Sequence, residues 1–139
     1  MKKLLGCLLV LVILLTLSQN VFAAYADTVK PYYNNATSAK VYLDIDASGT
    51  ANTSIFCQGK AGVKRIYVAT CLERKVNGAW ERVDIPSPND VWSYSTTSTT
   101  GMANYSASLP GRGEYRAVAT FTVTAATMET FTEIAYATY

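Results

Sequence analysis

The chain has 139 residues, with 12 Lys and Arg against 10 Asp and Glu, and it contains no histidine. The lack of histidine excludes Ser-His-Asp and Cys-His catalysis and zinc sites built on histidine. Lys2 and Lys3 account for the whole net charge of +2. The rest of the chain is neutral, so the sequence predicts no nucleic-acid partner and no anionic membrane surface.

Residues 1–26 have the organisation of a secretory signal peptide. Two lysines precede an uncharged apolar run, Leu4 to Leu17, and the small-residue sites "VFA" (21–23) and "AYA" (24–26) follow it. This order is typical of an exported chain with a cleavage site. The run is shorter than the roughly 20 residues that span a bilayer. We therefore expect cleavage, a secreted, extracellular protein, and no stable membrane span afterwards.

The polar stretch at 27–37, "DTVKPYYNNAT", predicts a flexible N-terminal arm. From residue 38 to 139, strand-forming residues dominate and no segment shows a helical period. Turn signals divide this region into short segments, which predicts a single all-β sandwich domain of about seven or eight strands. The strands expected are 38–46, 50–58, 63–75, 79–84, 91–97, 102–108, 113–125 and 128–138.

The segment "LERKVNGAWERV" (72–83) contains the clearest hairpin. Asn77 and Gly78 are the residue types that supply the two positive φ angles of a type I′ turn. Trp80 lies just past this turn.

The stretch "GRGEYRAVATFTVTA" (111–125) resembles the tyrosine corner of immunoglobulin-like Greek-key sandwiches. The resemblance implies that the Tyr115 hydroxyl ties the turn around Gly113 to the strand that follows. Ala117 stands where antibody domains carry their second core cysteine, so the resemblance concerns the architecture and not membership of the antibody family. An ordinary hairpin turn is the alternative explanation of this stretch.

A second resemblance covers nearly all of the chain after the signal peptide. The succession "SGTA", "VKRIYV", "LERKVNGAW", a Ser/Thr-rich stretch and "GEYRA" is similar to small secreted β-sandwich proteins of Gram-positive bacteria. Those proteins have no assigned function. The resemblance implies a compartment and a fold, and it implies no activity.

The acidic segment "DIDASG" (44–49) matches the start of an EF-hand calcium loop. The loop needs a bidentate glutamate at its twelfth position, where this chain has Ile55. We therefore interpret Asp44 and Asp46 as residues of a strand end and a turn. The sequence predicts no metal ligands, no cofactor and no catalytic residues.

Cys57 and Cys71 are the two cysteines that remain after the predicted cleavage. Oxidising conditions outside the cell favour a disulfide between them. The alternation of Ile66, Val68 and Leu72 points Cys71 away from the face that Cys57 shares with the core. A strand bulge, a strand covered on both sides and two free thiols all remain possible.

Aromatic residues are abundant, and exposed ones can stack on sugars or anchor a protein contact. We assign Tyr67, Tyr115 and Tyr136 to the core. The "PYY" segment (31–33) is the expected exposed pair. Trp80, Trp92 and Tyr94 fit either location.

These observations favour a non-catalytic extracellular module that binds an unknown protein or glycan. A secreted toxin, bacteriocin or inhibitor is the alternative, because a small exported β domain suits that role equally well. An enzyme ranks third.

Overall fold

Eight strands in two antiparallel sheets make up residues 32–139, the part of the chain that the computed structural model describes. The predicted signal peptide and residues 27–31 of the predicted arm lie outside the described residues. The strands are β1 (Ala36–Ile45), β2 (Thr50–Gly59), β3 (Arg65–Val76), β4 (Ala79–Arg82), β5 (Trp92–Thr96), β6 (Thr100–Ser108), β7 (Glu114–Thr124) and β8 (Met128–Thr138), with one 3-10 turn at Pro88–Asp90. Among residues 32–139, no helix is long and apolar enough to cross a membrane.

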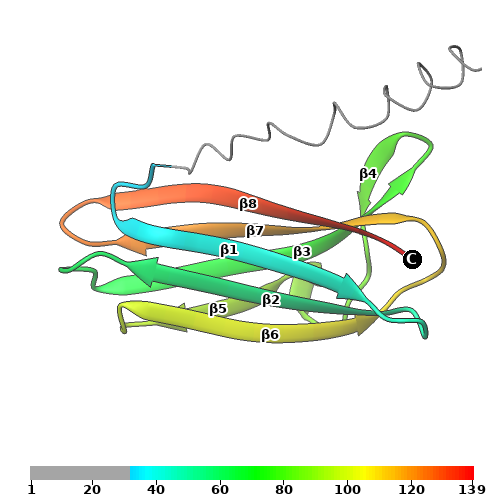
Figure 1. The fold of residues 1–139 in the computed structure, drawn as a ribbon, viewed down its shortest axis with the longest axis horizontal. Helices are drawn as coiled ribbons and strands as arrows, with labels where there is room; N and C mark the ends of the chain where they lie inside the picture. The colour runs from blue at the N-terminus through cyan, green and yellow to red at the C-terminus, as the bar shows by residue number, and fades with distance from the viewer. Residues whose placement is uncertain (1–31) are drawn as a thin grey trace, which may run out of the picture. The chain divides into compact units, whose positions relative to one another are not determined.

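The strand order is that of an immunoglobulin-like sandwich. One sheet has the order β1-β2-β6, and the other has the order β4-β3-β7-β8 with β5 also paired to β3 (Figure 1). The chain changes sheet between β2 and β3, between β5 and β6, and between β6 and β7, as the Greek key of these sandwiches requires. The predicted fold class and all eight predicted strands are confirmed, with strand ends displaced by two residues at most.

Strands β4 and β5 share one edge of β3. β5 pairs with Ile66–Thr70, and β4 pairs with Glu73–Val76 further along the same strand. The β3–β4 turn consists of Asn77 and Gly78, whose φ angles are 51° and 85°. Two consecutive positive φ angles define the type I′ hairpin that matches the twist of its strands, so this short hairpin follows directly from the local sequence.

Strand β7 lies in the middle of its sheet and supplies much of the core. It pairs with β3 on one side and β8 on the other. Alternate residues of β7 are completely buried between the two sheets: Tyr115, Ala117, Ala119, Phe121 and Val123. Ile66, Val68 and Leu72 of β3 are buried beside them.

The turn before β7 has the hydrogen bond of a tyrosine corner. The Tyr115 hydroxyl donates to the carbonyl of Gly111 at 2.5 Å. Gly113 exchanges backbone hydrogen bonds with the terminal residue Tyr139, at 3.1 and 3.0 Å. The guanidinium of Arg74 donates to the carbonyl of Arg112 at 2.7 Å. The turn is therefore tied to β7, to the end of β8 and to β3.

Two aromatic stacks close the sides of the sandwich. On the side where β1 lies next to β8, the ring of Phe131 stacks between Tyr33 and Phe121, with ring centroids 4.1 and 5.4 Å apart. On the other side, Trp92 of β5 stacks on Tyr105 of β6, with centroids 4.9 Å apart. Aromatic rings fill these gaps well because each one buries a large area with few rotatable bonds.

The described part of the predicted arm is held against the sandwich. Glu129 accepts hydrogen bonds from the backbone amides of Asn34 and Asn35, at 2.7 and 2.6 Å. The Asn35 side chain donates to the carbonyls of Val123 and Thr127. The prediction of a flexible arm is wrong for these residues, because the carboxylate of Glu129 holds their backbone amides. The local sequence gives no sign of this contact, since Glu129 belongs to the distant strand β8.

The "PYY" prediction is wrong for one of its two tyrosines. Tyr32 is 87 % exposed, but Tyr33 is only 8 % exposed. Its hydroxyl donates to Glu133, and its ring stacks on Phe131. Tyr33 therefore belongs to the core, and it anchors the chain just before β1.

We expect Tyr115→Phe to lower the free energy of unfolding by about 1 kcal/mol, because it removes one hydrogen bond and leaves the Gly111 carbonyl without its donor. Urea unfolding of both proteins measures the difference. Tyr42→Phe removes a hydroxyl from an exposed ring and serves as the control. Equal midpoints for Tyr115→Phe and the parent would contradict the role of the corner.

We also expect stability to fall at alkaline pH. Burial, and then the hydrogen bond to Glu133, raises the pKa of Tyr33. Burial, with a smaller contribution from Glu129, raises the pKa of Cys57 from 9.0 to about 11. Both groups are held neutral in the folded chain, so their contribution is complete below pH 9 and is lost as the pH rises through the folded pKa values.

Unfolding free energies measured at intervals from pH 7 to pH 11 test this expectation. Tyr33→Phe and Cys57→Ala should each flatten the alkaline slope, whatever constant loss of stability they also cause. Unchanged slopes in both variants would show that other groups produce the pH dependence.

Candidate binding face

Every second side chain of β7 points away from the core. The side chains opposite them on β3 and β8 point to the same outer side. Glu73 of β3, Arg116 of β7 and Tyr136 of β8 lie opposite one another in one row. The next row contains Glu114 of β7 and Thr138 of β8. We call this outer surface of β4, β3, β7 and β8, with β5, the binding face.

Four charged side chains of the binding face form two ion pairs near the β3–β4 hairpin. A guanidinium nitrogen of Arg116 lies 2.6 Å from a carboxylate oxygen of Glu73. The ammonium of Lys75 lies 2.7 Å from the carboxylate of Glu114. Burial works against the charged form of Arg116, but hydrogen bonds to Glu73 and Tyr136 outweigh it and raise the pKa of the guanidinium. The end of the face near the hairpin therefore carries two charge pairs with no net charge between them.

Trp80 leans over these charged rows from the β3–β4 hairpin. The Arg116 guanidinium carbon lies 4.5 Å from the centroid of the Trp80 ring, a distance typical of a cation–π contact. The Tyr136 ring lies 5.8 Å from the Trp80 ring, at an interplanar angle of 55°. Strand β4 and the distant pair β7 and β8 thus bring Trp80, Arg116 and Tyr136 together.

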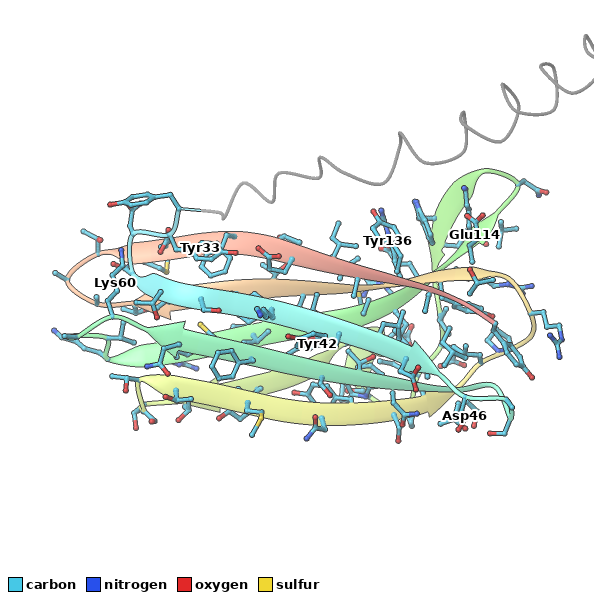
Figure 2. The ribbon with its side chains drawn as sticks, in the orientation of Figure 1. Tyr33, Tyr42, Asp46, Lys60, Glu114 and Tyr136 are labelled. Atoms are coloured by element: carbon cyan, nitrogen blue, oxygen red, sulfur yellow. The ribbon has the colours of Figure 1, made fainter. Side chains whose placement is uncertain are left out.

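A hollow of about 190 Å³ lies at this end of the binding face. Figure 2 shows two of its side chains, Tyr136 and Glu114, beside the β3–β4 hairpin. Its lining consists of Trp80, Glu114, Tyr115, Tyr136, Ala137 and Thr138. We call it the aromatic hollow, because two aromatic rings from different strands face it.

The rest of the binding face is rich in hydroxyl groups and apolar side chains. Thr120 and Thr122 of β7 each contact a threonine of β8 through their hydroxyls, at 3.3 Å. A second hollow of about 250 Å³ lies at the far end and is lined by Arg65, Tyr67, Thr122, Thr124 and Met128. Polar and apolar groups therefore alternate over most of the sheet surface.

Two tyrosines assigned to the core lie on this face instead. Tyr136 is 63 % exposed and stands opposite Arg116. Tyr67 is half-buried and lies between Ile66 and Val68, which both face the core. The assignment of both tyrosines to the core is wrong because strand alternation outweighs residue hydrophobicity. Tyr115 is completely buried, as expected.

The three undecided aromatic residues take different positions. Trp92 is buried, and Tyr94 packs against the core as a partly buried residue. Trp80 is half-buried on the binding face. The sequence predicts the hairpin that contains Trp80. It does not predict the contact of Trp80 with Arg116, because that contact depends on the pairing of β3 with β7.

Of the two acidic residues in "DIDASG", Asp46 serves the β1–β2 turn and Asp44 is exposed within β1. One oxygen of Asp46 accepts hydrogen bonds from the amide and hydroxyl of Ser48, at 2.9 and 2.6 Å, and from the amide of Thr50 at 2.9 Å. The hydrogen bond from the Ser48 side chain contributes most to lowering the pKa of Asp46. Within residues 32–139, no three Cys, Asp or Glu side chains are grouped as a metal site would require.

The two cysteines do not form the hypothesised bridge in this structure. Cys57 and Cys71 are both buried free thiols. Cys57 is part of the core between the sheets, whereas Cys71 alternates with the core residue Leu72 and is covered on the outer side of β3. Because Cys57 faces the core from one sheet and Cys71 faces outward from the other, the backbone of the second sheet lies between the two thiols and prevents the approach that a disulfide needs.

Comparison with known proteins gives no family. No family model matches the chain, and no curated protein matches it. Among solved structures, a CARDB domain of a protein from Pyrococcus furiosus, determined in complex with di-metal ions, is similar with 15 % sequence identity and a TM-score of 0.39. The match covers 78 % of this chain and 96 % of that domain. The fold described above therefore stands on its own strand order and pairing.

We expect both cysteines to resist alkylation in the folded protein, because burial covers the thiols and raises the pKa of each. Iodoacetamide treatment of a chain spanning 27–139, followed by intact mass measurement, tests this. The native protein should gain no adduct, and the protein unfolded in urea without reductant should gain two. An unfolded protein that gains adducts only after reduction would show a disulfide.

Proposed function

We propose that this protein is exported and acts as a non-catalytic module that binds a glycan or protein outside the cell through its binding face. The observation that carries the proposal is the concentration of exposed apolar side chains on one strand. Six large apolar residues are exposed among residues 32–139, and three of them, Met128, Ile134 and Tyr136, lie on the outer side of β8. Exposed apolar groups gathered on one surface are typical of interaction sites.

The charge arrangement supports binding rather than catalysis. The Lys75–Glu114 and Arg116–Glu73 pairs occupy charged groups that a catalytic site would need to keep available for a substrate. The carboxylate of Asp46 is engaged by its own turn. A surface of this kind offers shape, aromatic rings and hydrogen bonds to a partner, and these are the means by which interfaces gain affinity.

A matched pair of methionine substitutions tests which surface binds. Met128 on β8 is 71 % exposed, and Met102 on β6, in the other sheet, is 65 % exposed. A labelled chain spanning 27–139 is incubated with intact Gram-positive cells and with isolated cell-wall material, and the bound fraction is measured. We expect Met128→Glu to weaken binding by about tenfold, because it places an unpaired charge in the contact.

Met102→Glu adds the same charge to the opposite sheet and should leave binding unchanged. Loss of binding with Met102→Glu but not with Met128→Glu would move the contact to the other sheet. Absence of binding by the parent protein to any surface preparation would refute the proposed function.

A further inference from the structure

We propose that the aromatic hollow binds a single ring of an uncharged sugar, so that the binding face recognises a neutral glycan. This inference rests on the proposed function and names its ligand class. The hollow combines the rings of Trp80 and Tyr136 with the carboxylate of Glu114 and the hydroxyl of Thr138.

The size of the hollow favours one small ring. Pockets for drug-sized ligands have volumes of roughly 300 to 1,000 Å³, whereas this hollow has about 190 Å³. The rings of Trp80 and Tyr136 are inclined at 55° to each other, so they form two walls and not one flat surface. A sugar ring presents C–H groups to such walls and hydroxyl groups to the rim.

The aromatic walls are fixed before any ligand arrives. The Arg116 guanidinium lies over the Trp80 ring and is itself held by Glu73 at 2.6 Å. Tyr136 lies opposite Arg116 in the strand register, and its ring centroid lies 5.8 Å from that of Trp80. A preformed site loses little conformational entropy on binding, and this is an advantage for weak ligands such as single sugars.

The charges around the hollow favour a neutral ligand. An anion would lie near the carboxylates of Glu73 and Glu114, and a cation would lie near the Lys75 and Arg116 groups that already approach the Trp80 ring. Neither a cation nor an anion meets an unbalanced opposite charge there, because Lys75 is paired with Glu114 and Arg116 with Glu73. An uncharged polyol needs no such charge.

Hydrogen-bonding groups remain for the sugar hydroxyls. The side chain of Glu114 is 58 % exposed, and Lys75 engages one of its two oxygens. A carboxylate accepts hydrogen bonds at both oxygens, and bonds to a charged acceptor are stronger than neutral ones. The Thr138 hydroxyl at the rim can both donate and accept.

Calorimetric titration of a chain spanning 27–139 with uncharged mono- and disaccharides tests the inference. All eight strands lie within this chain, so the fold is retained. Glucuronic acid and choline serve as the anionic and cationic probes. We expect millimolar or tighter binding of at least one neutral sugar, weaker binding of both charged probes, and a change in Trp80 fluorescence, since Trp92 is buried in the core.

Three substitutions locate the site. Tyr136→Ala and Glu114→Gln should each weaken sugar binding about tenfold, which corresponds to 1.4 kcal/mol. Tyr42→Ala removes a tyrosine ring that is 54 % exposed, against 63 % for Tyr136, from the opposite sheet and should leave binding unchanged. Tyr136→Phe keeps the ring and controls for any loss of folding in Tyr136→Ala, because it should retain most of the affinity.

The outcomes separate this inference from the proposed function. If the parent binds cell surfaces but binds no neutral sugar, or if Tyr136→Ala and Glu114→Gln bind sugar as tightly as the parent, the sugar site is wrong and the binding face can still stand. Surface binding that survives periodate oxidation of the glycans would identify a protein partner and also overturn the sugar site.

Discussion

The alternation of β7 fixes which side of every strand in the five-stranded sheet faces the core. Its inner residues, from Tyr115 to Val123, are completely buried, and β7 pairs with β3 and β8 on its two sides. Because successive side chains of a strand point to opposite faces, a shift of one residue would exchange all inner and outer side chains. The large burial of the inner set makes such a shift very unfavourable. The positions of Glu73, Arg116 and Tyr136 on the outer side follow from that constraint.

The two lateral openings of the sandwich are closed by different means. On the side of β1 and β8, Glu129 and Glu133 point toward the segment before β1 and accept its hydrogen bonds. Inward-facing carboxylates of this kind also make an edge strand a poor template for pairing with another chain. On the other side, Trp92 stacks on Tyr105 without charged groups. One opening is therefore closed by hydrogen bonds to carboxylates, while the other is closed by ring stacking.

The binding face combines features that the core excludes. It carries two ion pairs, ladders of threonine hydroxyls and aromatic rings on the outer sides of strands whose inner sides are apolar. The tight Asn77–Gly78 turn brings β4 back alongside β3, so that Trp80, two residues after the turn, pairs with Lys75. This pairing places the Trp80 ring on the binding face. The ring then rests on Arg116, which belongs to a strand far along the chain. A local turn and a long-range strand pairing together create the aromatic hollow.

The sequence by itself determined the all-β class, the eight strands, the type I′ hairpin and the tyrosine at the corner before β7. These features depend on local turn chemistry and on the two-residue period of strands, and both can be read from neighbouring residues. Only the tertiary structure decided that Tyr136 is exposed, that Tyr33 is buried against Glu133, and that Cys57 lies in the core while Cys71 lies on the outer side of the other sheet. Each of these outcomes depends on which strand lies beside another and on which sheet contains it. Residue type alone carries no information on that pairing, because a tyrosine or a cysteine can occupy either face of a strand.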